Sequence, residues 1–256
     1  KLIEAFISES LPSATSTPQP DQPTTPLVTV VIPIYNGGTM LKAVVESCLT
    51  QDLDHEFEVL LIDSESTDGC IEALPQDRRL RLHRIRKEDF GHGRTRNLGV
   101  QLARGKYVAF ITQDAIPANR MWLMNLIAPL QNDPRVAGVF GCHIAHSDHG
   151  QLTAIDLDQH FNRWIYKSHR QPIELDAGRQ TANGAVSSHE RFYSDNNSCL
   201  RKCIWKTLPL PDVVYGEDQL WAQEILRKGY RKAYASTAVV RHSHEYGFRE
   251  TVLRAN

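Results

Sequence analysis

Residues 27–64, LVTVVIPIYNGGTMLKAVVESCLTQDLDHEFEVLLIDS, place two apolar, β-branched runs on either side of one amphipathic segment. The runs at 27–35 and 57–64 have the length and composition of buried strands, and the segment 37–51 between them has helical character. Near-continuous apolar strands joined by helices are typical of a parallel sheet that is covered on both faces. This stretch therefore predicts an α/β fold.

The same alternation continues along the chain. It predicts further strands at 79–85, 106–114, 136–144 and 232–240, and helices at 93–105, 119–133 and 218–228. The polar region 146–190 predicts an active-site loop system with one helix near 161–166. Together these elements predict a Rossmann-like, mostly parallel central sheet with helices on both faces.

The first 26 residues differ from the rest. A short helical pattern at 2–9 is followed by LPSATSTPQPDQPTTP, which has the composition of a linker. We therefore expect an N-terminal segment and linker at 1–26 and one domain at 27–256. Because the chain begins with Lys1, we expect it to be part of a longer protein.

Overall composition restricts the partners and the compartment. Lys and Arg number 29 against 30 Asp and Glu, so no global charge attracts nucleic acid or an anionic membrane. The five cysteines form no CxxC pair, which indicates a reducing compartment, and Cys199 and Cys203 are spaced as neighbours on one helix face. With no signal peptide and no apolar run of about 20 residues, the predicted location is the cytoplasm.

Polar residues follow the first two predicted strands. Ligands of open parallel sheets gather at the carboxyl ends of the strands. Pro33, Tyr35 and Asn36 end the first strand, and Asp63, followed by Glu65, ends the second. The Asp63 carboxylate can accept a hydrogen bond from a base or a ribose hydroxyl. The alternative is that these residues form ordinary turns and helix caps.

The stretch EDFGHGRTRNLGV, residues 88–100, concentrates cations at a predicted helix start. Arg94 and Arg96 oppose the positive end of the helix dipole there, so an anion is expected beside them. Gly91 and Gly93 allow a ligand to approach the backbone, and His92 can donate to a phosphate oxygen. The alternative is a solvated basic turn whose charges pair with acidic neighbours.

Three further groups carry candidate chemistry. Asp114, at the end of the strand 106–114, suits a divalent cation that bridges diphosphate oxygens, or else caps a turn. Glu217 and Asp218 supply either a general base or ordinary capping carboxylates at a helix start. His242, with His244 two residues later, is either a metal or phosphate contact or part of a surface loop.

Taken in order, six stretches resemble the family 2 glycosyltransferases of the GT-A fold. They are VVIPIYN, VLLIDSESTDG, GRTRNLGVQLARGKYVAFITQDAIP, NNSCLRK, GEDQLWAQEILRKGY and AVVRHSH, and the resemblance covers about residues 27–246. The stretches FGHGRTRN and TQDA look most like the bacterial rhamnosyltransferases, which use dTDP-L-rhamnose to build O-antigen and related surface polysaccharides.

The resemblance implies a role for each candidate residue. For the donor nucleotide, it implies contacts from Pro33, Tyr35, Asn36, Asp63, Glu65, His92, Arg94, Arg96, Asn97 and Gln113, with Arg94, Arg96 and Asn97 facing the diphosphate. For Mg²⁺ or Mn²⁺, it implies Asp114 and His242, although Thr112 replaces the first carboxylate of the family's Asp-x-Asp motif. For catalysis, it implies Asp218 as the base and Glu217 beside it. For the acceptor, the candidates are Asn197, Trp164, Tyr193 and His244, the aromatic rings being either a sugar platform or core packing.

The implied reaction is transfer of a sugar, with inversion, from a dTDP-sugar to a lipid-linked or oligosaccharide acceptor. Peripheral association with the inner face of the bacterial plasma membrane, and further domains of the same chain, remain open. One alternative is a non-catalytic nucleotide-sugar or glycan-binding module, and another is a transferase with a different nucleotide sugar. A nucleotidyltransferase is disfavoured, because IPIYNGG lacks the basic residue expected after its first strand.

Overall fold

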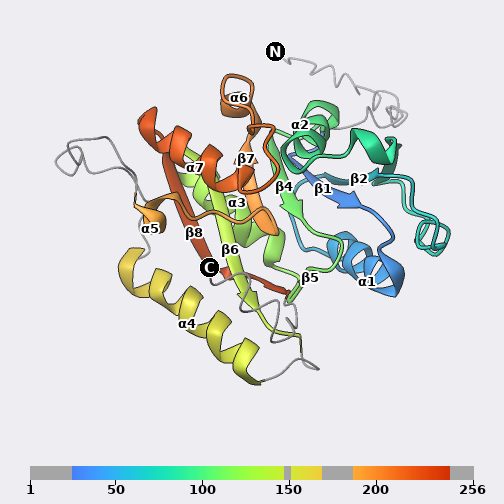
Figure 1. The fold of residues 1–256 in the computed structure, drawn as a ribbon, viewed down its shortest axis with the longest axis horizontal. Helices are drawn as coiled ribbons and strands as arrows, with labels where there is room; N and C mark the ends of the chain where they lie inside the picture. Colours follow the sequence, from blue (N-terminus) through green and yellow to red (C-terminus); the bar gives the residue numbers. More distant parts are fainter. Residues whose placement is uncertain (1–24, 147–150, 169–186, 243–256) are drawn as a thin grey trace, which may run out of the picture.

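The computed structural model describes residues 25–146, 151–168 and 187–242 (Figure 1). The strands are β1 (Val28–Ile34), β2 (Phe57–Asp63), β3 (Leu80–Arg84), β4 (Tyr107–Ile111), β5 (Ile116–Pro117), β6 (Val136–Ile144), β7 (Asn197–Arg201) and β8 (Arg231–Arg241). The helices are α1 (Gly38–Leu49), α2 (His92–Leu102), α3 (Trp122–Asn132), α4 (Gln151–Ser168), α5 (Ser188–Arg191), α6 (Lys202–Trp205) and α7 (Glu217–Arg227). A 3₁₀ turn, η1, covers Lys87–Asp89.

The strands form one sheet in the order β3-β2-β1-β4-β7-β6-β8-β5. Pairing is parallel from β3 to β4 and between β6 and β8, whereas β7 is antiparallel to both of its neighbours and β5 is antiparallel to β8. The prediction of a mostly parallel sheet is confirmed. The sequence analysis did not predict β5 or β7, which are the two antiparallel strands.

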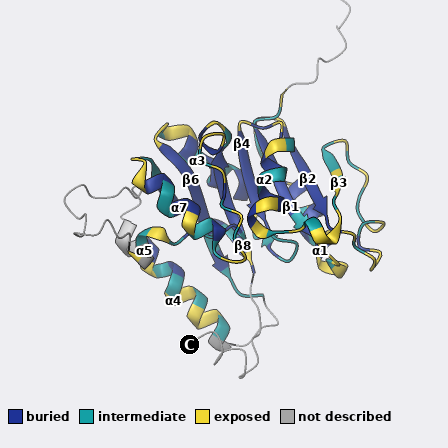
Figure 2. Cartoon of the chain, turned by 45° about the horizontal axis from the view of Figure 1, so that its top comes forward, coloured by how far each residue is buried: buried dark blue, intermediate teal, exposed yellow. Residues whose placement is uncertain are grey.

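Helices cover both faces of the sheet, as predicted. On one face α1 and α3 pack against the strands, and on the other face the core includes side chains from α2, α4, α6 and α7. The central strands are buried along most of their length, whereas β3 at one end of the sheet is partly exposed, and the helices bury one side and expose the other (Figure 2). This is the pattern expected when each amphipathic helix lays its apolar stripe on an apolar sheet.

The sheet reverses its strand order between β1 and β4. From β1 the chain steps to β2 and β3 on one side, and then returns to β4 on the other side. The β1–β2 pairing continues to Ile34 and Asp63, but the β1–β4 pairing ends at Val31 and Phe110. Pro33 has no N–H to extend the ladder. Such a reversal point is where open α/β sheets bind ligands.

Several local predictions are corrected by the structure. Helix α4 covers Gln151–Ser168 and is much longer than the helix predicted near 161–166. Cys199 lies on β7 and Cys203 on α6, so the two do not share a helix face. Residues 1–24, 147–150 and 169–186, which include most of the predicted linker and part of the predicted loop system, lie outside the described residues. None of the helices in the described ranges is long and apolar enough to cross a membrane.

Candidate functional site

Gln113 joins the ends of β1 and β4 across the point where their backbones separate. Its Oε1 accepts from the backbone N–H of Tyr35 at 2.9 Å, and its Nε2 donates to the carbonyl of Tyr35 at 3.0 Å. The side-chain amide therefore replaces the backbone pairing that ends at Val31 and Phe110. This arrangement fixes Tyr35, Gln113 and the following Asp114 at one edge of the sheet.

The predicted nucleoside residues lie together at the carboxyl ends of β1 and β2. Asn36 adopts a positive φ of 48°, donates from its backbone N–H to Ser66 Oγ and accepts from Thr67 N–H through its Oδ1. The Asp63 carboxylate is buried, and its Oδ1 accepts from the N–H of Ser66 at 3.0 Å. These bonds join the two loops, so the residues that the sequence assigned to the nucleoside also hold each other in place.

A polar cavity of about 520 Å³ opens beside these loops. It is lined by Glu65, Arg86, Lys87 and Glu88. The ammonium group of Lys87 lies 2.6 Å from the Tyr35 hydroxyl and 4.5 Å from the centre of its ring, and Glu65 accepts from the Lys87 N–H. The sequence analysis did not single out Lys87. A basic residue just after a strand of the same sheet was the signal that could have identified it.

Asp114 and His242 are neighbours, as the metal prediction requires. Their Oδ1 and Nε2 atoms are 3.6 Å apart although the residues are 128 positions apart in the chain, and His146 Nε2 lies 3.2 Å from the Asp114 carbonyl. The Thr112 hydroxyl is buried without a hydrogen-bond partner in the described part of the chain. No set of three or more His, Cys, Asp or Glu side chains there is arranged to hold a metal by itself. From the described residues alone, a divalent cation here would need oxygens of a ligand to complete its coordination.

The start of α2 divides into exposed and buried cations. Arg94 is exposed and pairs with the exposed Asp212, at 2.9 Å from Nη2 to Oδ2. His92 is also exposed, with its ring against Phe90. Because an exposed pair contributes about 0–1 kcal/mol, an anionic ligand can displace Asp212 from Arg94. Both side chains are accessible to a ligand, and their diphosphate role stays a prediction.

Arg96 and Asn97 are used differently from the prediction. Arg96 is only 5% exposed, and its Nη1 donates to Glu217 Oε1 at 2.9 Å. The Asn97 amide bonds to the backbone of Leu210 and accepts from Trp205 Nε1. Helix α2 packs against the 205–212 segment, which turns both side chains inward. The structure therefore does not present these two residues to a diphosphate.

Gly93 has a packing role that the sequence did not reveal. A Cβ at this position would lie 2.1 Å from the carbonyl oxygen of Pro211, whereas one at Gly91 would come no nearer than 3.3 Å to the Asp212 carboxylate and 3.4 Å to Arg94 Cβ. The glycine thus allows the 205–212 segment to contact the start of α2. Its predicted role, ligand approach, is replaced by contact with the protein's own backbone.

Three carboxylates gather around Arg96 at the start of α7. Glu217 and Asp195 are buried, and Asp195 Oδ2 lies 3.4 Å from Arg96 Nε. The backbone N–H of Asp195 donates to Asp218 Oδ2 at 3.2 Å, and the N–H of Gln219 donates to Asp218 Oδ1 at 2.7 Å. Asp218 is half-buried and lies at the edge of this cluster.

Burial changes the proton affinity of this cluster. Desolvation raises the pKa of Asp195 to about 7, against the attraction of Arg96, and the charges of Asp218 and Glu217 raise it further. Burial and the neighbouring Glu217 also raise the pKa of Asp218. A carboxylate whose pKa is raised toward neutrality is better suited to accept a proton from a hydroxyl group.

The predicted acceptor residues lie in the core instead. Trp164 and Tyr193 are each 2% exposed, and the Tyr193 hydroxyl is within hydrogen-bond distance of the Val139 and Cys199 carbonyls. Asn197 is fully buried and bonds to Trp122 Nε1 and to two backbone carbonyls. The packing alternative is therefore correct for the two aromatic rings, and Asn197 is likewise enclosed in the core. His244 lies outside the described residues.

An exposed aromatic residue lies just before the acidic pair in the chain. Tyr215 is 83% exposed, and Val214 next to it is 94% exposed. Gly216 follows with a φ of 80°, a left-handed conformation that turns the chain directly into α7. The sequence analysis passed over Tyr215, although its position three residues before Asp218 was visible.

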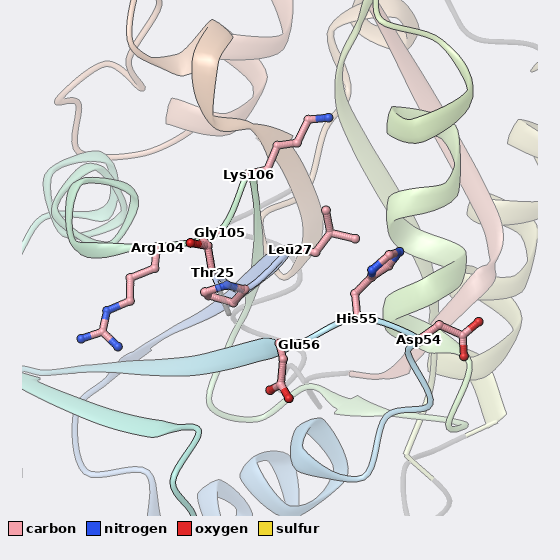
Figure 3. Close-up of a pocket in the computed structure, with 9 residues that line it drawn as sticks. Thr25, Leu27, Asp54, His55, Glu56, Arg104, Gly105 and Lys106 are labelled. Carbon is pink, nitrogen blue, oxygen red and sulfur yellow. The ribbon is translucent and has the colours of Figure 1, made fainter. Parts of the chain in front are cut away.

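A larger cavity, of about 650 Å³, lies elsewhere (Figure 3). Its lining includes Leu27, Glu56 and Lys106, which lie next to the amino ends of β1, β2 and β4. The predicted site residues follow the carboxyl ends of the same strands. A choice by cavity volume alone would therefore have missed the edge of the sheet where the polar loops and the acidic cluster lie.

Comparison with known proteins identifies the family of the chain. Residues 29–186 match the family model described as Glycosyl transferase family 2, which is more than half of the chain. The chain is 29% identical to the O-antigen chain rhamnosyltransferase RfbN of Salmonella typhimurium over 89% of its own length and 69% of that protein. It is 28% identical to the O-antigen chain rhamnosyltransferase WbaN of Salmonella anatum, over 90% and 70%.

Solved structures show the same fold. The mannosyltransferase PcManGT of Pyrobaculum calidifontis, in complex with GDP-Man and Mn²⁺, superposes with a TM-score of 0.63 at 22% identity, over 93% of this chain and 63% of that one. Residues 1–349 of TarS from S. aureus superpose with a TM-score of 0.61 at 19% identity, over 83% and 59%. This chain thus spans less than two thirds of either solved chain.

Proposed function

Because the chain belongs to glycosyltransferase family 2 and has the GT-A fold, we propose that it transfers L-rhamnose from dTDP-L-rhamnose to a hydroxyl of a bacterial surface glycan. The rhamnosyl donor and the O-antigen context rest on the two Salmonella relatives, whose names describe that activity. GDP-Man in one structural neighbour and UDP-GlcNAc in another support a nucleotide-sugar donor of this general kind.

One observation carries the proposal: the polar residues that follow β1, β2 and β4 and the acidic pair of α7 lie at the same edge of the sheet. Asp114 lies 3.6 Å from His242, and Arg96 on α2 lies 2.9 Å from Glu217 on α7. These contacts bring together residues more than a hundred positions apart in the chain. An edge that joins nucleotide-binding loops to a carboxylate of raised proton affinity suits group transfer from a nucleotide to a hydroxyl.

The donor would lie across the β1 and β4 ends. Tyr35, Asn36, Asp63 and Glu65 would hold the nucleoside, beside the cavity that Lys87 lines. In the same proposal, Arg94, His92 and the free N–H groups of the first turn of α2 would face the diphosphate. Stabilisation of the charge that develops on the leaving diphosphate is usually the largest single contribution to such catalysis.

The acceptor would approach from the side of α7. Asp218 would remove the proton of the acceptor hydroxyl while that oxygen forms a bond to C1 of the sugar. The bond from C1 to the phosphate oxygen would break with its electron pair going to dTDP, and the proton would stay on Asp218. Attack opposite the leaving group gives inversion at C1. The ring of the exposed Tyr215 would pack against the acceptor sugar.

Mg²⁺ or Mn²⁺ would be held by Asp114 and His242, with the remaining positions taken by diphosphate oxygens and water. Thr112 stands where the Asp-x-Asp motif has a carboxylate. Its hydroxyl is buried and has no hydrogen-bond partner among the described residues, so a polar ligand group at this position would satisfy it. When bound, the cation supplies charge stabilisation to the diphosphate. Mn²⁺ in the mannosyltransferase neighbour supports this part of the proposal.

A donor screen tests the donor class. The melting temperature of the chain would be measured with dTDP-L-rhamnose, UDP-GlcNAc and GDP-mannose, each with and without Mn²⁺. A ligand that binds only the folded state raises its stability by RT ln(1 + c/Kd), where c is the free ligand concentration, so at equal concentrations dTDP-L-rhamnose should give the largest increase. A larger increase with another donor would refute the rhamnosyl assignment but not the transferase.

A variant tests the catalytic step. With dTDP-L-rhamnose and a panel of octyl glycosides as acceptors, release of dTDP would be measured together with the mass of the glycosylated product. Asp218→Asn should lower turnover by about 10²–10⁴-fold, the usual contribution of a general base, and should leave donor binding intact. Unchanged turnover in this variant would exclude Asp218 as the base.

A further inference from the structure

The side chain of Arg96 is enclosed by protein groups rather than open to the donor. Its Nη1 donates to Glu217 Oε1 at 2.9 Å and lies 3.3 Å from the carbonyl of His92, and its Nε lies 3.4 Å from Asp195 Oδ2. With 5% of the residue exposed, no face of the guanidinium is left for a ligand as large as a diphosphate. The charge of Arg96 therefore acts on the carboxylates around it.

Asp195 connects this ion pair to Asp218. Its Oδ1 accepts from the Ser198 hydroxyl at 2.6 Å, which anchors the residue to the start of β7. Its backbone N–H donates to Asp218 Oδ2 at 3.2 Å. Asp195 is 2% exposed, so the contact is formed within the protein and not through a flexible surface loop.

We propose that Arg96 and Asp195 are positioning residues for Asp218: Arg96 fixes the start of α7 through Glu217, and Asp195 orients the Asp218 carboxylate through its own backbone N–H. This inference rests on the proposed function, in which Asp218 is the general base. In this proposal neither residue contacts the donor or the acceptor.

Positioning of this kind has a large expected effect on the rate. A displacement of about 1 Å at a reacting group lowers the rate by about 10²-fold. Asp218 is held by two backbone donors, from Asp195 and Gln219, so the loss of either changes its orientation. The start of α7 is in turn held to α2 by the bond between Arg96 and Glu217.

Charge gives a second effect that packing alone would not. The charged groups that face Asp218 are Glu217 on its own helix, Arg96 on α2 and Asp195 before β7. Arg96 is the cation among them, and it favours the ionised form of Asp218. Without it, Asp218 would hold its proton to higher pH, and the acidic limb of the kcat profile would move to higher pH.

The experiment measures kcat and the donor KM across pH, with dTDP-L-rhamnose and an octyl glycoside acceptor. Arg96→Met should lower kcat by about 10–100-fold, change the donor KM by less than about 3-fold, and move the acidic limb upward. Arg96→Lys keeps the charge but loses the planar fork, so it should restore the position of the limb and only part of kcat.

Arg94→Met is the matched comparison on the same helix. Arg94 is exposed and faces the diphosphate in the proposed function, so this variant should raise the donor KM and leave the acidic limb in place. Arg78→Met removes an exposed guanidinium that pairs with Glu56 next to the amino ends of β2 and β3, away from the carboxyl ends where the site lies, and should change neither parameter.

Asp195 is tested by rescue. Asp195→Ala removes the anchor to Ser198 and should lower kcat by about tenfold. Asp195→Asn keeps the shape and a hydrogen-bonding partner for the Ser198 hydroxyl, so it should recover most of kcat. A general loss of packing would not be rescued through one hydrogen bond.

Two results would overturn the inference. One is a donor KM raised tenfold or more by Arg96→Met or Arg96→Lys with kcat retained, since that would make Arg96 a donor ligand. The other is a wild-type kcat in both single variants, Arg96→Lys and Asp195→Ala. If Arg96→Met does not fold, the other variants still give these readouts. Failure of the wild-type chain to transfer from any donor would refute the proposed function itself.

Discussion

Replacing Asp195 by asparagine should make the folded chain more stable at neutral pH. Burial raises the pKa of Asp195 from its ordinary 3.8 to about 7, so the folded state favours the protonated form. A pKa difference of about three between the folded and the unfolded chain corresponds to about 4 kcal/mol in the free energy of unfolding. This value is an upper limit, because Asp195 and Asp218 titrate together. This is a large fraction of the 5–15 kcal/mol, roughly, that stabilises a typical domain.

The sign follows from the two states. Below about pH 4 Asp195 is protonated in the folded and the unfolded chain, so its full contribution to stability is present. As the pH rises to about 7, the unfolded chain ionises freely while the folded chain resists, and that contribution is lost. Asparagine does not ionise, and Asp195→Asn should therefore lose no stability by this route.

The assay is urea denaturation of both proteins at several pH values from 4.5 to 8, followed by tryptophan fluorescence. The free energy of unfolding of Asp195→Asn minus that of the wild type should be small at pH 4.5 and should rise to a few kcal/mol at pH 8. Asp212→Asn is the control, since Asp212 is an exposed carboxylate paired with Arg94, and its difference should stay within about 0.5 kcal/mol.

A difference that does not change with pH would show that Asp195 is not a buried carboxyl group of raised pKa. A difference of the opposite sign at pH 8 would show that Arg96 stabilises the ionised form outright. Either result would refute the claim that the buried carboxylate of Asp195, which orients Asp218, lowers the stability of the folded chain at neutral pH.

Three other predictions follow from single contacts. Asp114→Asn should abolish the extra thermal stabilisation that Mn²⁺ gives in the presence of dTDP, because it removes the carboxylate ligand; stabilisation that persists would place the metal elsewhere. Gly93→Ala should lower the free energy of unfolding by about 1–3 kcal/mol in urea denaturation, because its Cβ would meet the Pro211 carbonyl at 2.1 Å, whereas Gly91→Ala should be tolerated. Tyr215→Ala should raise the acceptor KM by about 2–10-fold with the donor KM unchanged, since an aromatic contact contributes about 0.5–1.5 kcal/mol; an unchanged acceptor KM would remove Tyr215 from the acceptor site.

Much of the sheet was predictable because burial leaves a strong periodic signal. Strands β1, β2, β4 and β6 are apolar runs, and their order with the helices between them predicted a mostly parallel sheet. Strand β7 was missed because NSCLR is short and polar in its first residues. Its polar side chains are satisfied by partners from distant elements, such as Trp122 for Asn197, and local sequence does not show such partners.

The same reason explains which candidate site residues the structure brings together and which it buries. Asp114 and His242 were predicted as a pair, and they are neighbours in the structure. Arg96 and Arg94 have identical chemistry two positions apart, and only the packing of α2 against α7 decides which is buried. Sequence alone could show that the helix start needed an anion, but it could not show that the anion facing Arg96 is Glu217.

The antiparallel direction of β7 explains why Asp195 belongs to the site at all. In a parallel sheet the residues that precede a strand lie at the opposite edge from the ligand. Because β7 runs against β4 and β6, its first residue Asn197 pairs with Ile111 at the carboxyl end of β4. The residues just before Asn197 are thereby delivered to the edge where the parallel strands end. One reversed strand thus places Asp195 next to Asp218, and a fully parallel sheet would have put the same sequence on the other side of the molecule.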